Sequence, residues 1–161
     1  MLALTGLLTL TACDRHSEDE ARTLLSGWVD LGDTLYFESQ SGCTAGVFRV
    51  KSADVKARVP VFDSAQAVVM NGKQEGPFAL REPGKTADQL FIDLMNAHRP
   101  TGVAVQSASV EARPCMNDKA RNSFFSVLNA DRSVVIFSRA DRAYAVLDPL
   151  RGIVMLTSGG E

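Results

Sequence analysis

Apolar residues recur at helical spacing in several stretches of the chain, and most of these stretches begin at a residue that caps helices. Ser17 and Thr86 are each followed three residues later by Glu or Gln, which is the capping box that marks a helix start. Asn117 is a third N-cap. Three apolar stripes follow these caps and are expected to be buried: Leu24, Leu25, Trp28 and Leu31; Ala87, Leu90, Phe91, Leu94 and Met95; Ala120, Phe124, Val127 and Leu128.

Two further segments have weaker periodicity. A short amphipathic segment begins at Asp63 and stops at Asn71, before a glycine. Residues 102–113 fit either a strand or a helix, and their small side chains favour a helix packed closely against a neighbour. Between these two segments, Gly-Pro and Pro-Gly pairs predict that residues 73–85 form a loop.

β-branched and aromatic residues mark the strands. Residues 34–50 predict a β-hairpin around a Ser/Gly-rich cluster, with Cys43 at its turn or early in its second strand. Residues 134–137, 143–147 and 153–156 are three short strands with tight connections, which is typical of an antiparallel meander. The sequence therefore predicts an α+β fold, in which an N-terminal helix and hairpin, central helices and a C-terminal meander share one core.

The chain begins with an apolar segment at residues 2–10. This segment is too short to cross a bilayer, which takes about 20 apolar residues as a helix, and its length is typical of an export signal. Export signals normally open with Lys or Arg, but nothing charged precedes Asp14. A natural start upstream of Met1 therefore stays an open alternative.

The apolar segment ends in Leu10-Thr11-Ala12-Cys13, which resembles the lipobox of bacterial lipoproteins. The resemblance implies that residues 1–12 are a cleaved signal peptide and that Cys13 becomes an acylated first residue, carrying fatty acids such as palmitate. The protein would then be anchored to a bilayer of the cell envelope and face the periplasm. Asp14 resembles an inner-membrane retention signal, so inner and outer membrane both stay open. The alternatives are an ordinary cleaved signal and a buried N-terminal helix.

A second resemblance joins two separate stretches. Residues 31–48 (LGDTLYFESQSGCTAGVF) and 113–118 (RPCMND) resemble uncharacterised envelope lipoproteins of alphaproteobacteria. This resemblance implies no activity.

The three cysteines fit an oxidising compartment. With Cys13 acylated, Cys43 and Cys115 remain, and we expect them to form a disulfide, because they belong to neither a CxxC motif nor a spaced metal set. Two alternatives stay open. One is a reactive thiol with His98 as its base, and the other is a pair of unbonded buried cysteines.

The composition is that of an ordinary globular protein, with 45% hydrophobic and 22% charged residues. The net charge of −2 comes from interspersed signs without a basic patch, so nucleic acid is not an expected partner. Without its signal the chain keeps roughly 150 residues, which suits one domain. The expected organisation is a lipidated tether at 13–16, a single domain at 17–157 and a flexible tail at 158–161.

Candidate catalytic chemistry is sparse. No nucleophile, metal-binding or phosphate-binding motif is present, and we predict no cofactor and no metal site. His98 is the one plausible catalytic imidazole of the folded part, because His16 lies in the tether. The preferred interpretation of His98 is structural: its ring packs over the core edge, with its proton near the negative end of its own helix.

These features favour an accessory role without catalysis, in which the anchored domain binds an envelope protein or cell-wall material. The alternative is a periplasmic hydrolase-like enzyme that uses His98 and unidentified carboxylates. A third possibility is a carrier of a small apolar or anionic ligand. Ala-Asp-Arg occurs at 130–132 and at 140–142, and we interpret both copies as turns, with a shared Asp/Arg anion site as the alternative.

Overall fold

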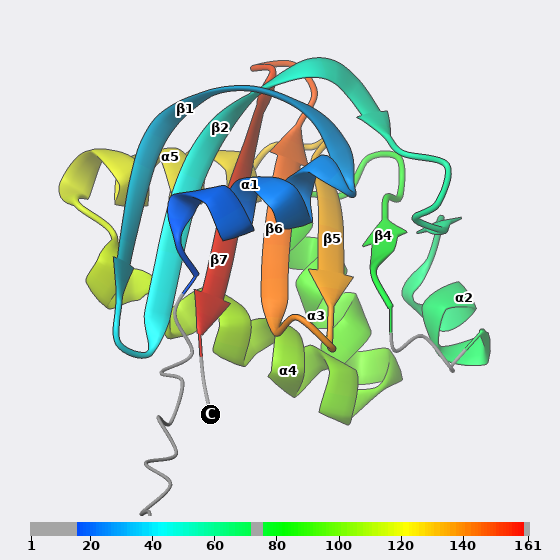
Figure 1. Ribbon diagram of the computed structural model, residues 1–161. Coiled ribbons are helices and arrows are strands. Elements are labelled where there is room, and N and C mark those ends of the chain that lie inside the picture. Colours follow the sequence, from blue (N-terminus) through cyan, green and yellow to red (C-terminus); the bar gives the residue numbers. More distant parts are fainter. Residues whose placement is uncertain (1–15, 72–75, 160–161) are drawn as a thin grey trace, which may run out of the picture.

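The computed structural model describes residues 16–71 and 76–159, which form an α+β fold around one antiparallel sheet (Figure 1). Within these residues the sheet has seven strands in the order β1-β2-β7-β6-β5-β4-β3, and only the short β3–β4 pair is parallel. The strands are β1 (Val29–Gln40), β2 (Cys43–Val55), β3 (Val61–Phe62), β4 (Phe78–Leu80), β5 (Val134–Ser138), β6 (Ala143–Asp148) and β7 (Ile153–Gly159). The helices are α1 (Glu18–Ser26), α2 (Ala65–Met70), α3 (Ala87–Ala97), α4 (Arg99–Val110), the 3-10 helix η1 (Arg113–Cys115) and α5 (Asp118–Leu128).

The helices cover both faces of the sheet. In Figure 1, α1 lies in front of the sheet and α3 and α4 lie behind it. Side chains that alternate along each strand separate the two resulting cores. On β6, Tyr144 and Val146 belong to the core that contains α3, α4 and α5, whereas Ala145 and Leu147 belong to the core under α1. Every residue of β5 and β6 is buried, as is expected of strands that are covered on both sides.

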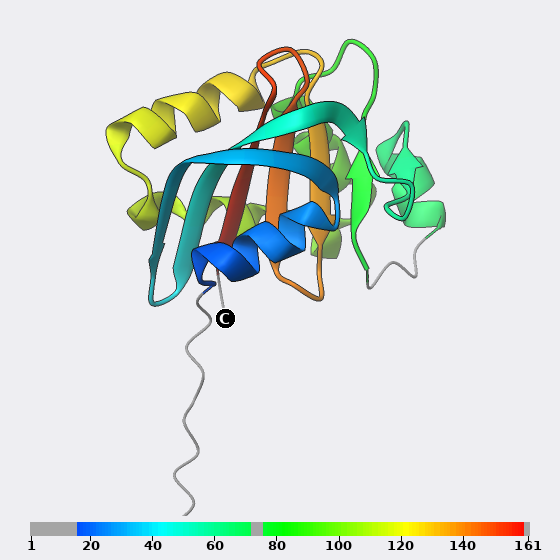
Figure 2. The same ribbon diagram turned by 45° about the horizontal axis from the view of Figure 1, so that its top comes forward.

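The two ends of the sheet carry different turns. At one end, which we call the hairpin end, Thr44 pairs with both Ser39 and Ser158, close to the β1–β2 turn and the β5–β6 turn. At the other end, the far end, β5 begins at Val134 and the β6–β7 turn follows Asp148. The first residues of α1 lie at the hairpin end, because His16 and Ser17 share a shallow surface hollow with Ser39. Figure 2 shows the same separation of the two ends from a second direction.

Local capping signals in the sequence were correct. Ser17 with Glu20 and Thr86 with Gln89 form complete capping boxes at α1 and α3, and Asn117 caps α5. The helix favoured over residues 102–113 is α4, in which the small Gly102 and Ala108 are buried. Hairpin and meander are also present, and Cys43 is the first residue of β2.

The expected disulfide is confirmed. Cys43 and Cys115 are bonded, with their Cα atoms 6.0 Å apart and a sequence separation of 72. Both cysteines are buried. Beside the bond, the Tyr36 hydroxyl donates to the Cys115 carbonyl at 2.7 Å and accepts from the Asn117 amide at 3.2 Å. The hairpin is therefore held to the segment between α4 and α5 by one covalent bond and two hydrogen bonds.

The expected stripe of the first helix was wrong beyond Leu25. Helix α1 ends at Ser26, Trp28 lies in the following turn, and Leu31 lies in β1. Trp28 and Leu31 are buried as expected, but they reach the core from extended backbone. Pairing of β1 with β2 competes with helix continuation here, and that tertiary contact is absent from the local pattern.

The expected loop at 73–85 was wrong in its middle. Phe78, Ala79 and Leu80 form β4, fully buried between β5 and the parallel β3. Three residues between breakers are too few to show a period, so this strand is set by its neighbours. At the other terminus, β7 extends to Gly159, two residues into the expected tail. Residues 160–161 lie outside the described part.

Strand β1 is an edge strand, and its pairing with β2 is interrupted by register shifts between Val29 and Tyr36. The Arg22 side chain of α1 donates to the Gly32 carbonyl at 2.9 Å and to the Thr34 hydroxyl at 2.8 Å. Bulges and side-chain contacts of this kind are ways in which proteins block edge-to-edge pairing. Across residues 16–71 and 76–159, no helix combines the length and the apolar character that crossing a membrane requires.

Candidate functional site

The residues of the expected lipid anchor, Leu10 to Cys13, lie outside the described residues. The first described element after them is the capped start of α1 at the hairpin end. Both remaining cysteines belong to the disulfide. The alternative of a reactive thiol with His98 as its base is therefore wrong, because neither Cys43 nor Cys115 is a free thiol.

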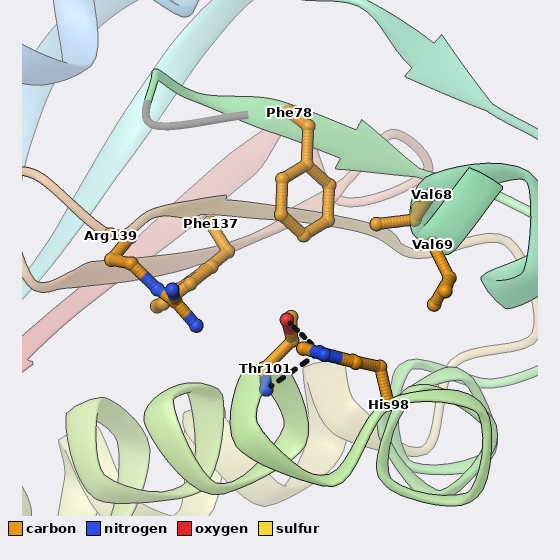
Figure 3. A pocket seen from close by; sticks show the side chains of 7 residues that line it. All are labelled: Val68, Val69, Phe78, His98, Thr101, Phe137 and Arg139. Carbon is orange, nitrogen blue, oxygen red and sulfur yellow. Dashed lines mark hydrogen bonds between the residues drawn. The ribbon is translucent and has the colours of Figure 1, made fainter. Parts of the chain in front are cut away.

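His98 lines a small pocket of about 110 Å³ (Figure 3). The pocket lies where α2, β4, β5 and the α3–α4 junction meet. Its remaining lining residues are Val68 and Val69 from α2, Phe78 from β4, Thr101 from α4, Phe137 from β5 and Arg139 from the β5–β6 turn. The two phenylalanine rings meet edge to face, with their centroids 5.9 Å apart, and form an apolar wall.

The structural role expected for His98 was wrong in its detail. His98 ends α3 and is also the N-cap of α4, and its side chain accepts from the Thr101 amide at 3.4 Å through Nδ1. The Thr101 hydroxyl lies 2.9 Å from the same nitrogen. The ring therefore caps the positive end of the next helix, and it is exposed rather than packed over the core edge. Because Nδ1 accepts a backbone N–H, the neutral ring carries its proton on Nε2.

The described lining of the pocket holds no partner for acid-base catalysis. Its seven described residues include no carboxylate and no cysteine. A general base is normally oriented by a second polar group, and within the described chain the His98 ring forms hydrogen bonds with Thr101 alone. Among the described residues no cluster of His, Cys, Asp or Glu could hold a metal ion. What the pocket offers is an apolar wall, one arginine and one imidazole.

Groups with displaced pKa values lie elsewhere. The pKa of Glu20 is lowered because the Ser17 backbone amide and then the Ser17 hydroxyl donate to its carboxylate. The pKa of Lys85 is raised by Asp93 at 2.6 Å and by Glu82 at 2.9 Å. Burial, and secondarily the charge of Asp88, raises the pKa of Tyr144. These groups cap a helix, join a loop to α3 and fill the core, so they support the fold rather than mark a reaction centre.

A second concave surface, which we call the far-end groove, lies at the far end of the sheet. It has a volume of about 630 Å³ and is formed by three loops and the end of β2. Its apolar lining comes from Ala53, Pro83, Val134, Pro149 and Leu150, and its charged lining comes from Asp54, Arg81, Glu82, Asp131 and Arg132. Leu150 is 69% exposed at the β6–β7 turn and is the most exposed of the groove's large apolar side chains.

The β6–β7 turn that presents Leu150 is rigidly built. The buried Asp148 carboxylate accepts from the backbone amides of Leu150 and Arg151 at 3.0 and 3.1 Å, and from the Arg151 guanidinium at 2.6 Å. These contacts order the backbone that carries the exposed leucine. The apolar side chain is therefore held at the surface by its turn.

The two Ala-Asp-Arg triplets do not form one site. Residues 130–132 precede β5, and Asp131 and Arg132 line the far-end groove, whereas 140–142 lie in the turn after β5, at the hairpin end. Both are turns, as expected, but the carboxylate of Asp141 accepts from the Ser138 hydroxyl rather than from its own backbone. The alternative of a shared Asp/Arg anion site is wrong, because β5 separates the two triplets.

Sequence reasoning missed Arg139 and Leu150. Arg139 follows β5 in a charged turn, and only packing brings it beside His98. Leu150 carried a signal in hindsight, since an apolar residue after proline in a polar turn has no helix or strand to bury it. Comparisons with protein-family models, with curated proteins and with solved structures find no match to this chain.

Proposed function

We propose that this protein is an envelope lipoprotein, anchored through acylated Cys13, that binds another envelope protein through the far-end groove and catalyses no reaction. The observation that carries this proposal is the position of the groove. It lies at the far end of the sheet, whereas α1, which follows the lipobox by four residues, begins at the hairpin end. A domain held by so short a tether would turn its hairpin end to the bilayer and its groove to the periplasm.

The make-up of the groove supports a protein partner rather than cell-wall glycan. Its lining combines apolar side chains, among them Leu150, Pro149 and Val134, with charged side chains of both signs. Such a combination of apolar and polar side chains is typical of protein interfaces. The disulfide supports the compartment, because paired thiols persist in the oxidising space outside the cytoplasm.

The anchor is tested by the intact mass of the protein purified from its native membrane and alkylated without a reducing agent. The expected species begins at Cys13, carries acyl chains and takes up no alkylating reagent. A chain that keeps residues 1–12, or one without acyl groups, would overturn the anchor. The groove is tested independently of this result.

The groove is tested with a photo-crosslinking amino acid placed at Leu150 in the native host. Met70 is the matched control position, because it is a large apolar residue that is 87% exposed on α2, away from the groove. A discrete protein adduct is expected from position 150 and not from position 70, and Arg132→Glu should abolish it. Equal labelling from both positions, or an adduct that survives Arg132→Glu, would contradict a protein-binding groove. Adducts with cell-wall fragments alone would assign the groove to the wall.

A further inference from the structure

The His98 pocket is a second concave site, separate from the far-end groove and not explained by partner binding there. We propose that it binds a small organic carboxylate that carries a short apolar group. The ligand's carboxylate pairs with Arg139, and its alkyl group lies against Phe78, Phe137 and Val68. The geometry in Figure 3 carries this assignment, since Arg139 and His98 enter from opposite elements around one apolar wall.

The charge of the pocket selects an anion. Among the described residues of the lining, Arg139 is the one with a permanent charge, and none of them is a carboxylate that could neutralise it. Within residues 16–71 and 76–159, the Arg139 guanidinium has no hydrogen-bond or ion-pair partner. An arginine in this state can offer the two parallel N–H groups that match the two oxygens of a carboxylate.

His98 supplies a second donor. Thr101 occupies Nδ1 and thereby fixes the proton of the neutral ring on Nε2, which has no acceptor among the described residues. An anion here meets a cation and an N–H donor without needing a metal ion.

The size and the apolar wall select the rest of the ligand. An apolar cavity of about 150 Å³ accepts benzene, so 110 Å³ suits a ligand of about five non-hydrogen atoms. Phosphate and sulfate would turn additional oxygens toward valine and phenylalanine side chains, where those oxygens lose their hydration without gaining donors. A carboxylate with one or two further carbon atoms places its oxygens on the donors and its methyl group on the rings.

Two sources supply this chemistry: a free short-chain acid and the C-terminal residue of a peptide. Propionate and N-acetylalanine represent them, because they share the methyl group and the carboxylate and differ by the acetamido group. Propionamide has the shape of propionate without the charge and is the ligand control. Each probe is titrated into the full-length, ¹⁵N-labelled protein with its disulfide formed, and the backbone amide shifts are followed.

We expect saturable shifts from propionate that are confined to the lining residues and their neighbours, and none from propionamide. Arg139→Gln should weaken binding by about tenfold or more, as expected when a charge-assisted pair is lost. Arg99→Gln is the matched control, because it removes an arginine at the start of α4 that does not line the pocket, and binding should stay within about twofold of the original protein. Val69→Phe fills the pocket while keeping both donors and should also abolish binding.

Binding of N-acetylalanine as well as propionate would assign the pocket to peptide C-termini, and binding of propionate alone would assign it to free acids. The proposal is overturned if neither acid gives saturable local shifts, if propionamide binds as well as propionate, or if Arg139→Gln and Arg99→Gln weaken binding equally. None of these results depends on the anchor or on the far-end groove, so failure here leaves the proposed function standing.

Discussion

Removal of the Cys43–Cys115 disulfide should cost this protein a large part of its stability. The perturbation is the double substitution Cys43→Ala and Cys115→Ala, which replaces two buried side chains with smaller apolar ones and leaves an unpaired thiol at neither position. The disulfide joins the first residue of β2 to η1, on the segment between α4 and α5. The native positions of these elements are also held by sheet pairing and by Tyr36, so we expect the variant to keep the same fold.

The magnitude follows from the loop that the bond closes. A separation of 72 residues corresponds, in the chain-entropy model, to a stabilisation of about 4 kcal/mol at 25 °C through restriction of the unfolded chain. Domains of this size have typical stabilities of about 5 to 15 kcal/mol, so the loss is a substantial fraction of the whole. With a urea m-value of about 2 kcal/mol per M, the unfolding midpoint should fall by roughly 2 M.

Urea unfolding followed by circular dichroism measures this change, with the m-value fitted in each case. The matched control is the original protein after reduction without alkylation, because it lacks the bond but keeps both sulfur atoms. Its midpoint should agree with that of the double variant. A loss below about 1 kcal/mol in both would refute the loop-entropy argument. A large loss in the variant alone would assign the stabilisation to side-chain packing instead of the bond.

Three further substitutions test other parts of the fold. Gly102→Ala should lower stability by about 1 to 3 kcal/mol in thermal unfolding, because a Cβ atom there would lie 2.5 Å from the Met95 Cα atom; an unchanged melting temperature would contradict the close approach of α3 and α4. Asp148→Ala should cost about 2 kcal/mol in urea unfolding, because it leaves the β6–β7 turn amides without their acceptor. In the Glu20→Gln variant, the free energy of unfolding should fall less between pH 6 and pH 3 than it does in the original protein. The lowered pKa of Glu20 means that its carboxylate stabilises the fold above its unfolded pKa and loses this effect as pH falls through the folded value, whereas glutamine caps Ser17 without titrating. Parallel acid profiles of the two proteins would refute that assignment.

The sequence predicted the parts of this fold that short-range interactions decide. Each capping box uses a side chain and a backbone amide three residues apart, so Ser17 and Thr86 mark their helices without help from the rest of the molecule. The meander was visible because its strands are rich in β-branched residues and are joined by tight turns. The disulfide was predicted from the number of cysteines and from the oxidising compartment expected for the protein.

The misassigned elements depend on tertiary contacts. Strand β4 consists of Phe78, Ala79 and Leu80, and its extended form is imposed by β5 on one side and β3 on the other. The sequence correctly placed His98 at the end of one helix. Pro100 also lies in the first turn of the next helix, and the imidazole caps that second helix. The pocket around it could not be predicted, because its residues come from four separate segments of the chain.

The sheet order has a consequence for how the molecule assembles. Strand β2, which begins at Cys43, pairs with β7, which ends at Gly159, and β7 alone connects the N-terminal hairpin to β6. The hairpin can form early from contacts close in sequence, but it cannot join the sheet until the last strand is available. The native sheet is therefore completed by β7, and a chain shortened before β7 would leave the described strands in two separate sets.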